Sequence, residues 1–382
     1  TYNDVTPIRE TATNAITFAA TNSSTTITAT DASHGAVTGD FVTFSQAVSL
    51  GGNITATVLN QEYQINSVPS ANTYTFTATA TANSSDTGNG GSGVDGAYQI
   101  NSGLDVYVQS TGWGAGTWGA GAWGSTSNLV SSNQLRLWSI DNFGDDTILN
   151  PRSDGIYYWD ESSGTDNRAV NVTSLGGASN VPTKTFQIML SDVDKHVIAF
   201  GCNPIGSSNL DPLLVRFSDT ESITDWTPTA TNQAGGVQLS MGSTIIGALR
   251  TRQEILIWTD VGIVSMRFVG APFVFSFNEV ANGPSLISPN AAVNANNQVY
   301  FMDNGGFYTY AGSAQRLPCT VLDYVLSDLN QGQSFKVFGA VNSIANEIMW
   351  FYPSGDSLEV DKYVMYNYLE QVWSIGTTTD DF

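Results

Sequence analysis

Residues 245–270 and 288–312 decide the fold, and they read IIGALRTRQEILIWTDVGIVSMRFVG and SPNAAVNANNQVYFMDNGGFYTYAG. Both segments follow the same order: a strand of small residues, a polar turn, an aromatic-rich strand, a turn with glycine and a further strand. The aromatic-rich strands end in an acid, at Asp260 and at Asp303. Units of three or four antiparallel strands that recur about every forty to fifty residues are the repeat of a β-propeller. The two segments therefore predict a propeller body.

The composition favours strands over helices. The chain has 382 residues, of which 41% are hydrophobic and only 12% are charged, while Thr, Ser, Asn and Gly are abundant. Aromatic residues make up 11%, and β-branched and aromatic side chains suit a pleated, half-buried surface. This amount of apolar sequence is enough for a real core. We expect an all-β protein.

The charge balance argues against tight binding of nucleic acid. Acidic residues number 34 against 13 basic ones, which gives a formal net charge of -21, and the first hundred residues contain a single basic side chain, Arg9. Binding to phosphates depends on clustered Lys and Arg. An acidic surface repels DNA, so the composition suits a conduit for DNA better than a clamp on it.

The two cysteines and the chain ends give only weak signals. Cys202 and Cys319 are far apart and lie beside apolar residues and proline, so we expect two buried thiols, not a disulfide or metal pair. The sequence contains no signal-peptide pattern and no run of eighteen apolar residues, so no membrane-spanning segment is expected. The start lacks Met and the end follows a strand directly, which favours processing or an incompletely covered chain.

The N-terminal part divides into a short strand and an insertion. Residues 1–11 are expected to form an N-terminal strand of the propeller body. Residues 12–96 are rich in Thr, Ala, Ser and Asn, and stretches such as TTITAT and TYTFTATAT alternate with a period of two. Such alternation indicates half-buried antiparallel strands. We therefore predict a small β-barrel or sandwich module inserted into the body, ending at the flexible sequence SSDTGNGGSG.

Residues 97–133 are expected to form a Gly/Trp-rich strand and loop that join the body. Trp113, Trp118 and Trp123 recur every five residues between Gly and Ala, a period that fits neither a helix nor a strand. An extended loop would present these three indoles. It either tucks them over the body or offers them as an interaction surface, because Trp is favoured at the buried centres of interfaces; stacking on carbohydrate is a further alternative.

Residues 134–382 are predicted to form the propeller blades, about five of which can be counted. Acids that end strands set the rhythm at intervals of 59, 41 and 43 residues: Asp160, Asp219, Asp260 and Asp303. The N-terminal strand could complete another blade by pairing with a C-terminal one, which would remove exposed edges. One amphipathic helix is predicted near 320–331, packed on the body and ending at Gly332.

Residues with catalytic potential are few. His34 and His196 are the only histidines and lie far apart, which argues against a metal centre or a Ser-His-Asp triad. We interpret Asp260 and Asp303 as turn formers and not as paired catalytic carboxylates. The sequence SDTESITDW, from Ser218, is similar to the Asp-box of sialidase-type propellers but lacks its glycine and occurs once. No arginine constellation can be identified, so we expect no catalytic residue, no cofactor and no metal.

Several segments, in the same order along the chain, resemble the tail nozzle, or tail tubular protein B, of short-tailed bacteriophages. They are YNDVTPIR, GAGTWG, LRLWSIDNFGDD, GIYYWD, DVDKHVIAFG, IIGALRTRQEILIWTD, SMRFVG, ISPNAAV, YFMDNGGFYTY and VMYNYLEQVW. The resemblance covers nearly the whole chain outside residues 12–96. That insertion resembles small β modules of phage structural proteins that carry HGxxxGDxVTF.

The resemblance implies a structural protein of the virion tail and no enzyme. Subunits would assemble with copies of themselves into a ring, expected to be a hexamer, beneath the portal and adaptor. Tail fibres or spikes would be further partners, and phage DNA would pass through the lumen without specific binding. Two alternatives remain: an adhesin of the virion or cell surface whose propeller binds glycans, and a propeller glycosidase.

Overall fold

The computed structural model of the chain describes residues 3–101, 103–104, 106–107, 135–192 and 194–378. The chain divides into two compact units, which we describe separately: Thr1–Gly103 with Tyr157–Asn171, and Leu104–Ile156 with Val172–Phe382. Strands dominate the described residues, and α-helix is confined there to α1 (Ala56–Leu59) and α2 (Leu322–Asp328). The chain is all-β, which confirms the predicted fold class.

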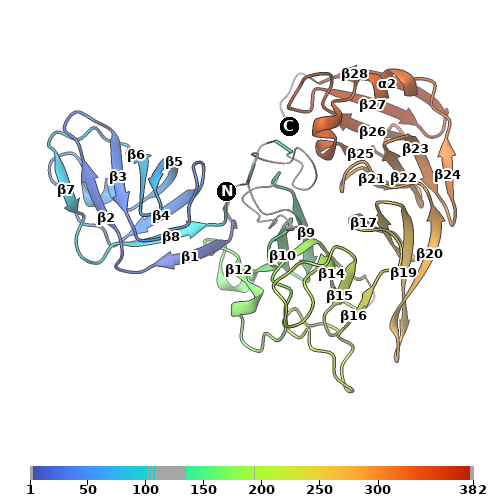
Figure 1. Cartoon of the computed structure of the whole chain (residues 1–382), viewed down its shortest axis with the longest axis horizontal. Coiled ribbons are helices and arrows are strands. Elements are labelled where there is room, and N and C mark those ends of the chain that lie inside the picture. The colour runs from blue at the N-terminus through green and yellow to red at the C-terminus, as the bar shows by residue number, and fades with distance from the viewer. Residues whose placement is uncertain (1–2, 102, 105, 108–134, 193, 379–382) are drawn as a thin grey trace, which may run out of the picture. The chain divides into compact units, whose positions relative to one another are not determined.

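The first unit is built on one antiparallel sheet, drawn in blue to cyan in Figure 1. Its strands are β1 (Ile8–Ala12), β2 (Thr17–Ala20), β3 (Thr26–Thr30), β4 (Phe41–Ser45), β5 (Glu62–Ser70), β6 (Thr73–Thr77), β7 (Asp86–Asn89) and β8 (Asp95–Gln99). Their order in the sheet is β1-β8-β4-β5-β6-β3-β2-β7. The unit also contains α1, the short pair β11 (Tyr157–Trp159) and β12 (Val170–Asn171), and the 3-10 turn η2 (Glu161–Ser163).

The period-two pattern of the insertion places one face of this sheet in a core. In β3, Ile27 and Ala29 are fully buried, while the threonines between and beside them are partly or fully exposed. The rings of Phe18, Phe44 and Phe76 meet at centroid distances of 4.9 to 5.9 Å within the same cluster. Alternation along each strand therefore gives a single apolar core, as expected for half-buried strands.

The boundaries of this unit differ from those expected at 12 and 96. β1 pairs with β8, from Ile8 opposite Gln99 to Ala12 opposite Gly96, so β1 belongs to this sheet and not to a propeller blade. The expected boundary followed a change in composition. Strands pair through hydrogen bonds between backbone groups, which do not depend on side-chain composition. The sheet therefore continues beyond the point where the composition changes.

Residues 157–171, which the sequence assigns to the blades of 134–382, are grouped with the first unit. Arg168 forms ion pairs with Asp4 at 2.6 Å and with Glu62 at 2.6 Å, and the Ala169 N–H donates to the Val5 carbonyl. All these partners are residues of the first unit, far away in sequence, and no local pattern reveals such contacts.

The second unit consists of consecutive antiparallel sheets, coloured from green to red in Figure 1. β9 (Trp138–Phe143) and β10 (Asp146–Pro151) form a hairpin that belongs to a four-stranded sheet of order β12-β11-β10-β9, as expected for a blade. Four more four-stranded sheets follow in sequence order. Their strands are β13 (Thr185–Leu190), β14 (Val197–Cys202), β15 (Leu214–Phe217), β16 (Gly235–Gln238); β17 (Ile245–Arg250), β18 (Ile255–Thr259), β19 (Gly262–Gly270), β20 (Val274–Asn282); β21 (Ala292–Ala295), β22 (Gln298–Asp303), β23 (Gly306–Tyr310), β24 (Ala314–Leu317); β25 (Phe338–Asn342), β26 (Glu347–Tyr352), β27 (Lys362–Asn367), β28 (Val372–Thr377).

The first strands of successive sheets lie next to one another, as in a propeller. β9 lies beside β13, β13 beside β17 and β21 beside β25. Between β13 and β17, the Gln187 amide donates to the Ala248 carbonyl and accepts from the Ala248 N–H. Gly247 comes so close to Pro289 that a Cβ would lie 2.8 Å from the Pro289 carbonyl oxygen. This repeated side-by-side arrangement makes the fold of the unit propeller-like.

The inner strands β14, β18 and β22 of the second unit are buried on both faces, which explains their continuous apolar sequences. All five residues of β18, ILIWT, are buried. Leu256 and Trp258 belong to the core shared with the β21–β24 and β25–β28 sheets, whereas Ile255 and Ile257 belong to the core shared with the β13–β16 sheet. An apolar run without alternation is the pattern of a strand covered on both sides.

The described helix α2 lies where the amphipathic pattern predicts one, but it is shorter. Val325 is fully buried, and Leu329, in extended backbone, ends the helix. Gly332 does not cap α2; it lies in the following 3-10 segment η4 (Gln331–Lys336). A further 3-10 turn, η3 (Val172–Ser174), precedes β13. Within the part of the chain that the structure describes, no helix has the length and apolar character needed to cross a membrane.

Candidate functional site

The three tryptophans singled out in the sequence, Trp113, Trp118 and Trp123, lie outside the described residues. The interaction surface predicted there stays a prediction.

The strand-ending acids accept hydrogen bonds from backbone groups, but those of Asp260 and Asp219 come from segments 14 to 17 residues away and not from their own turns. Asp260 accepts hydrogen bonds from the Ser243 N–H and hydroxyl and from the Thr244 N–H. Burial alone would raise the pKa of Asp260, but these bonds outweigh burial and hold it below its usual value. Asp219 accepts from the Gln233 N–H, and Asp303 from the Asn304 N–H. In the first unit, Asp160 caps η2 in the same way.

The Asp-box-like segment serves packing. Trp226 is buried, donates its indole N–H to the Ile223 carbonyl and lies under the guanidinium of Arg216. His196 is also buried, and its Nδ1 lies 2.7 Å from the Ser218 carbonyl oxygen. His34 is buried in the core of the first unit. Trp226, His196 and His34 therefore fill the interior.

The cysteines are free thiols. Cys202 is buried, and burial raises the pKa of its thiol to about 12, so it is not a nucleophile at neutral pH. Cys319 is only partly buried, which differs from the expectation of two buried thiols. Among the described residues, no group of three or more His, Cys, Asp and Glu side chains is placed to hold a metal ion.

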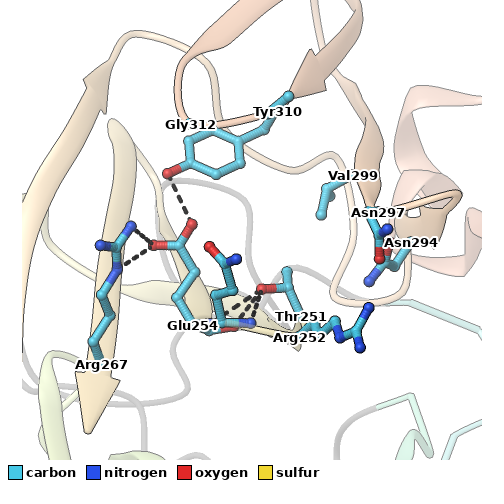
Figure 2. Close-up of a pocket in the computed structure, with 11 residues that line it drawn as sticks. Thr251, Arg252, Glu254, Arg267, Asn294, Asn297, Val299, Tyr310 and Gly312 are labelled. Atoms are coloured by element: carbon cyan, nitrogen blue, oxygen red, sulfur yellow. Dashed lines mark hydrogen bonds and ion pairs between the residues drawn. The ribbon is translucent and has the colours of Figure 1, made fainter. Parts of the chain in front are cut away.

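A polar cavity of about 460 Å³ opens in the second unit, beside the turn that joins β17 to β18 (Figure 2). Its wall combines that turn with β19, the turn between β21 and β22, and the end of β23. The lining residues are Thr251, Arg252, Gln253, Glu254, Arg267, Asn294, Asn297, Val299, Tyr310, Ala311 and Gly312. We call this cavity the arginine pocket.

Glu254 organises one side of the arginine pocket. Its side chain is only 8% exposed and forms an ion pair with Arg267, whose Nε and Nη2 lie 3.0 and 2.9 Å from one carboxylate oxygen. The Tyr310 hydroxyl donates to the other carboxylate oxygen at 3.1 Å, and the Ser265 hydroxyl donates as well. Burial, reinforced by the negative charge of Glu254, raises the pKa of Tyr310 to about 12. Both carboxylate oxygens of Glu254 have hydrogen-bond partners within the protein, so Glu254 holds the side chains of Arg267 and Tyr310 in place.

The other side of the arginine pocket carries donors without a protein partner. Arg252, Asn294 and Asn297 are exposed, and their side chains make no hydrogen bond or ion pair with any residue that the structure describes. Figure 2 places them together, across the pocket from Glu254 and Arg267. Two arginines and one glutamate line the cavity, so its own charge is positive in a chain of net charge -21. This local sign favours an anionic occupant.

The sequence reading missed this group. Arg250, Arg252 and Arg267 lie within eighteen positions in a chain with thirteen basic residues, and that density is the signal that could have revealed it. Their roles differ in the structure. Arg250 is neutralised by Asp141 and Asp192, at 3.1 Å each, whereas Arg252 stays available.

A projecting hairpin forms a second candidate site. β18 pairs with β19 only as far as Met266, but β19 and β20 continue together to Gly270 and Val274. Near the tip, Phe273 is 78% exposed and Val269 is 54% exposed. Figure 1 shows these two long strands extending past the rest of their sheet. These exposed apolar side chains on a protruding element are a candidate interaction surface.

Two turns at one end of the β25–β28 sheet form a third apolar surface, which we call the apolar turns. The turn after β25 carries Ile344, 95% exposed, and the turn after β27 carries Leu369, 65% exposed. The Tyr368 N–H and hydroxyl both donate to Asn346, which holds the turns side by side.

No protein-family model and no curated protein matches this sequence. Similar solved structures include the phage phi92 endosialidase (12% identity, 91% of this chain and 47% of that chain, TM-score 0.22) and Kluyvelomyces marxianus Hsv2 (9%, 64% and 65%, 0.33). An ancestral GH74 enzyme is also similar (10%, 80% and 41%, 0.40). The chain thus spans less than two thirds of each of these three. Such distant likenesses carry no argument about function.

Proposed function

We propose that the chain is a structural subunit of a ring-shaped phage tail nozzle, the channel for genome ejection below the portal and adaptor. The order of segments described above resembles that family. In this proposal the protein is not an enzyme, and its work is to hold copies of itself together around a passage for DNA in the virion tail.

The observation that carries the proposal is the projecting β19–β20 hairpin with Phe273 exposed at its tip. The apolar turns around Ile344 and Leu369 supply a different surface on the same unit. Two unlike surfaces allow a head-to-tail contact between copies, and head-to-tail contacts close into rings when the rotation fits. An isologous dimer would need only one self-complementary surface.

The charge of the chain agrees with passage of DNA. A chain of net charge -21 favours a lumen in which acids outnumber bases, and such a lumen would repel the phosphate backbone. DNA would then pass through the channel without binding tightly to its wall.

Sedimentation velocity of the purified chain at micromolar concentration tests the proposal. We expect a species six times the mass of one chain. Replacing the tip residues together, Val269→Ser with Phe273→Ser, should shift most of the protein to smaller species, because the apolar contact is lost.

The matched control is Val48→Ser in the first unit, since Val48 is 54% exposed, the same as Val269. This control should leave assembly unchanged. A wild-type chain that stays monomeric, or a tip variant that assembles like the wild type, would contradict the proposal.

A further inference from the structure

We propose that the arginine pocket binds a saccharide that carries a carboxylate. The pocket shares β19 with the hairpin assigned to assembly, through Arg267, but the inference does not depend on the nozzle proposal. Its argument rests on the unused hydrogen-bonding groups of the pocket, its charge and its size.

Arg252 is the group that selects the anion. Its guanidinium presents five N–H donors in a planar fork that matches a carboxylate in two parallel bonds. In the described part of the chain no acid pairs with it, whereas Arg250 and Arg267 each have a carboxylate partner. An incoming carboxylate would therefore not have to displace a protein carboxylate from Arg252.

Asn294 and Asn297 suit the hydroxyls of the same ligand. An amide side chain both donates and accepts, which is what a sugar hydroxyl requires of a neighbour. Both amides lie on the side of the pocket that holds Arg252 (Figure 2). Val299 and Tyr310 also line the pocket but are buried, at 2% and 3% exposure, so polar groups supply most of the surface that a ligand meets.

The far wall of the pocket is already rigid. Glu254 holds Arg267 and Tyr310 in place through bonds that are complete without a ligand. Because these groups need no rearrangement, binding loses little entropy on that side. Glu254 is thus a positioning residue.

The size of the pocket fits one or two sugar units. A cavity of about 460 Å³ lies within the usual range of roughly 300 to 1,000 Å³ for small-ligand sites. It opens on the surface, so a terminal or internal unit of a longer acidic polysaccharide could enter.

Isothermal titration of the whole chain with sodium glucuronate and, separately, with glucose tests the inference. The two sugars share a pyranose ring and differ in having a carboxylate or a hydroxymethyl group. We expect glucuronate to bind roughly ten- to hundredfold more tightly, as hydrogen bonds to a charged group imply. The difference should shrink in high salt, because an exposed guanidinium is screened.

Arg252→Gln should remove the preference for glucuronate and leave binding of glucose nearly unchanged. Arg252 is exposed, so this change does not disturb the core. Arg252→Lys keeps the charge but not the fork, and it should recover only part of the preference. The matched control is Lys195→Gln, which removes one exposed positive charge outside the pocket and should leave the preference intact.

Three outcomes would overturn the inference: no binding of glucuronate, equal affinity for both sugars, or an Arg252→Gln chain that still prefers glucuronate. Sedimentation of the same variants separates this result from the assembly proposal. Arg252→Gln should form the same species as the wild type whether or not the pocket binds a sugar.

Discussion

The strands β3 and β18 show how differently the two units are stabilised. β3, with the sequence TITAT, buries alternate residues in one core. β18, with the sequence ILIWT, buries every residue, and its two faces pack into two different cores. A one-sided sheet tolerates change on its outer face. A two-sided sheet has no outer face, so each position connects neighbouring sheets.

Alanine substitutions should give the largest effects and test this contrast directly. Leu256→Ala and Ile257→Ala remove buried side chains from opposite faces of β18, and each should cost about 2–5 kcal/mol of unfolding free energy. In β3, Ile27→Ala should cost a similar amount, but Thr28→Ala should stay within about 0.5 kcal/mol. Urea unfolding measures all four. The contrast would break if either β18 change were as mild as Thr28→Ala.

Two tyrosine–carboxylate pairs give the next largest difference. The Tyr98 hydroxyl donates to Asp31 at 2.6 Å inside the first unit, where Asp31 is buried. Tyr98→Phe would leave that carboxylate short of a partner and should cost about 1–3 kcal/mol. Tyr310→Phe should cost less, about 1 kcal/mol, because Glu254 keeps its bonds from Ser265 and Arg267. Equal losses in urea unfolding would argue against this ranking.

Alkaline pH tests the environment of Tyr310 separately. Burial raises the pKa of Tyr310 from 10.0 to about 12, so the folded state keeps a proton that the unfolded state loses. The corresponding stability is present below pH 10 and is lost as the pH rises toward 12. Tyr310→Phe should therefore lose less stability over this window than the wild type does. Thermal unfolding between pH 10 and 12 measures the stability of both proteins. An equal loss of stability in the wild type and in Tyr310→Phe would contradict the raised pKa of Tyr310.

The smallest effect concerns two buried tryptophans of the second unit. The Trp350 indole N–H donates to the Ala291 carbonyl at 2.9 Å, whereas that of Trp258 has no acceptor among the described residues. Both side chains are fully buried. Trp350→Phe should cost about 1 kcal/mol more than Trp258→Phe, since only the former removes a hydrogen bond; the Ala291 carbonyl keeps its bond from the Met302 N–H. Unfolding free energies that reverse this order would show that Trp258 has an unseen partner.

Much of the fold could be predicted because its pattern is local. The aromatic runs that became β18 and β22 identify strands from a few residues, and alternation in TITAT identifies a half-buried one. The boundaries were harder. β1 joins β8 across more than eighty residues, and Arg168 reaches Asp4 and Glu62. Such contacts depend on the folded backbone and not on any neighbouring sequence.

The candidate site was largely invisible in the sequence for the same reason. Arg252 is an ordinary turn residue and Asn294 an exposed residue of β21 until two neighbouring sheets bring them to one cavity. Their exposure and lack of partners appear only in three dimensions. The exposed Phe273 likewise follows a strand that, by pattern alone, could have ended at Phe268.

The pairing of β1 with β8 has a consequence for how this protein could be altered. The chain enters and leaves the eight-stranded sheet side by side, and the Ile100 N–H donates to the Pro7 carbonyl just outside the pair. A domain whose two ends meet behaves as a cassette: it can be exchanged for another, or shortened to a few linking residues, without stretching the backbone on either side. Diversification by swapping is therefore open to residues 8–99, and a replacement would lose the ion pair of Glu62 with Arg168.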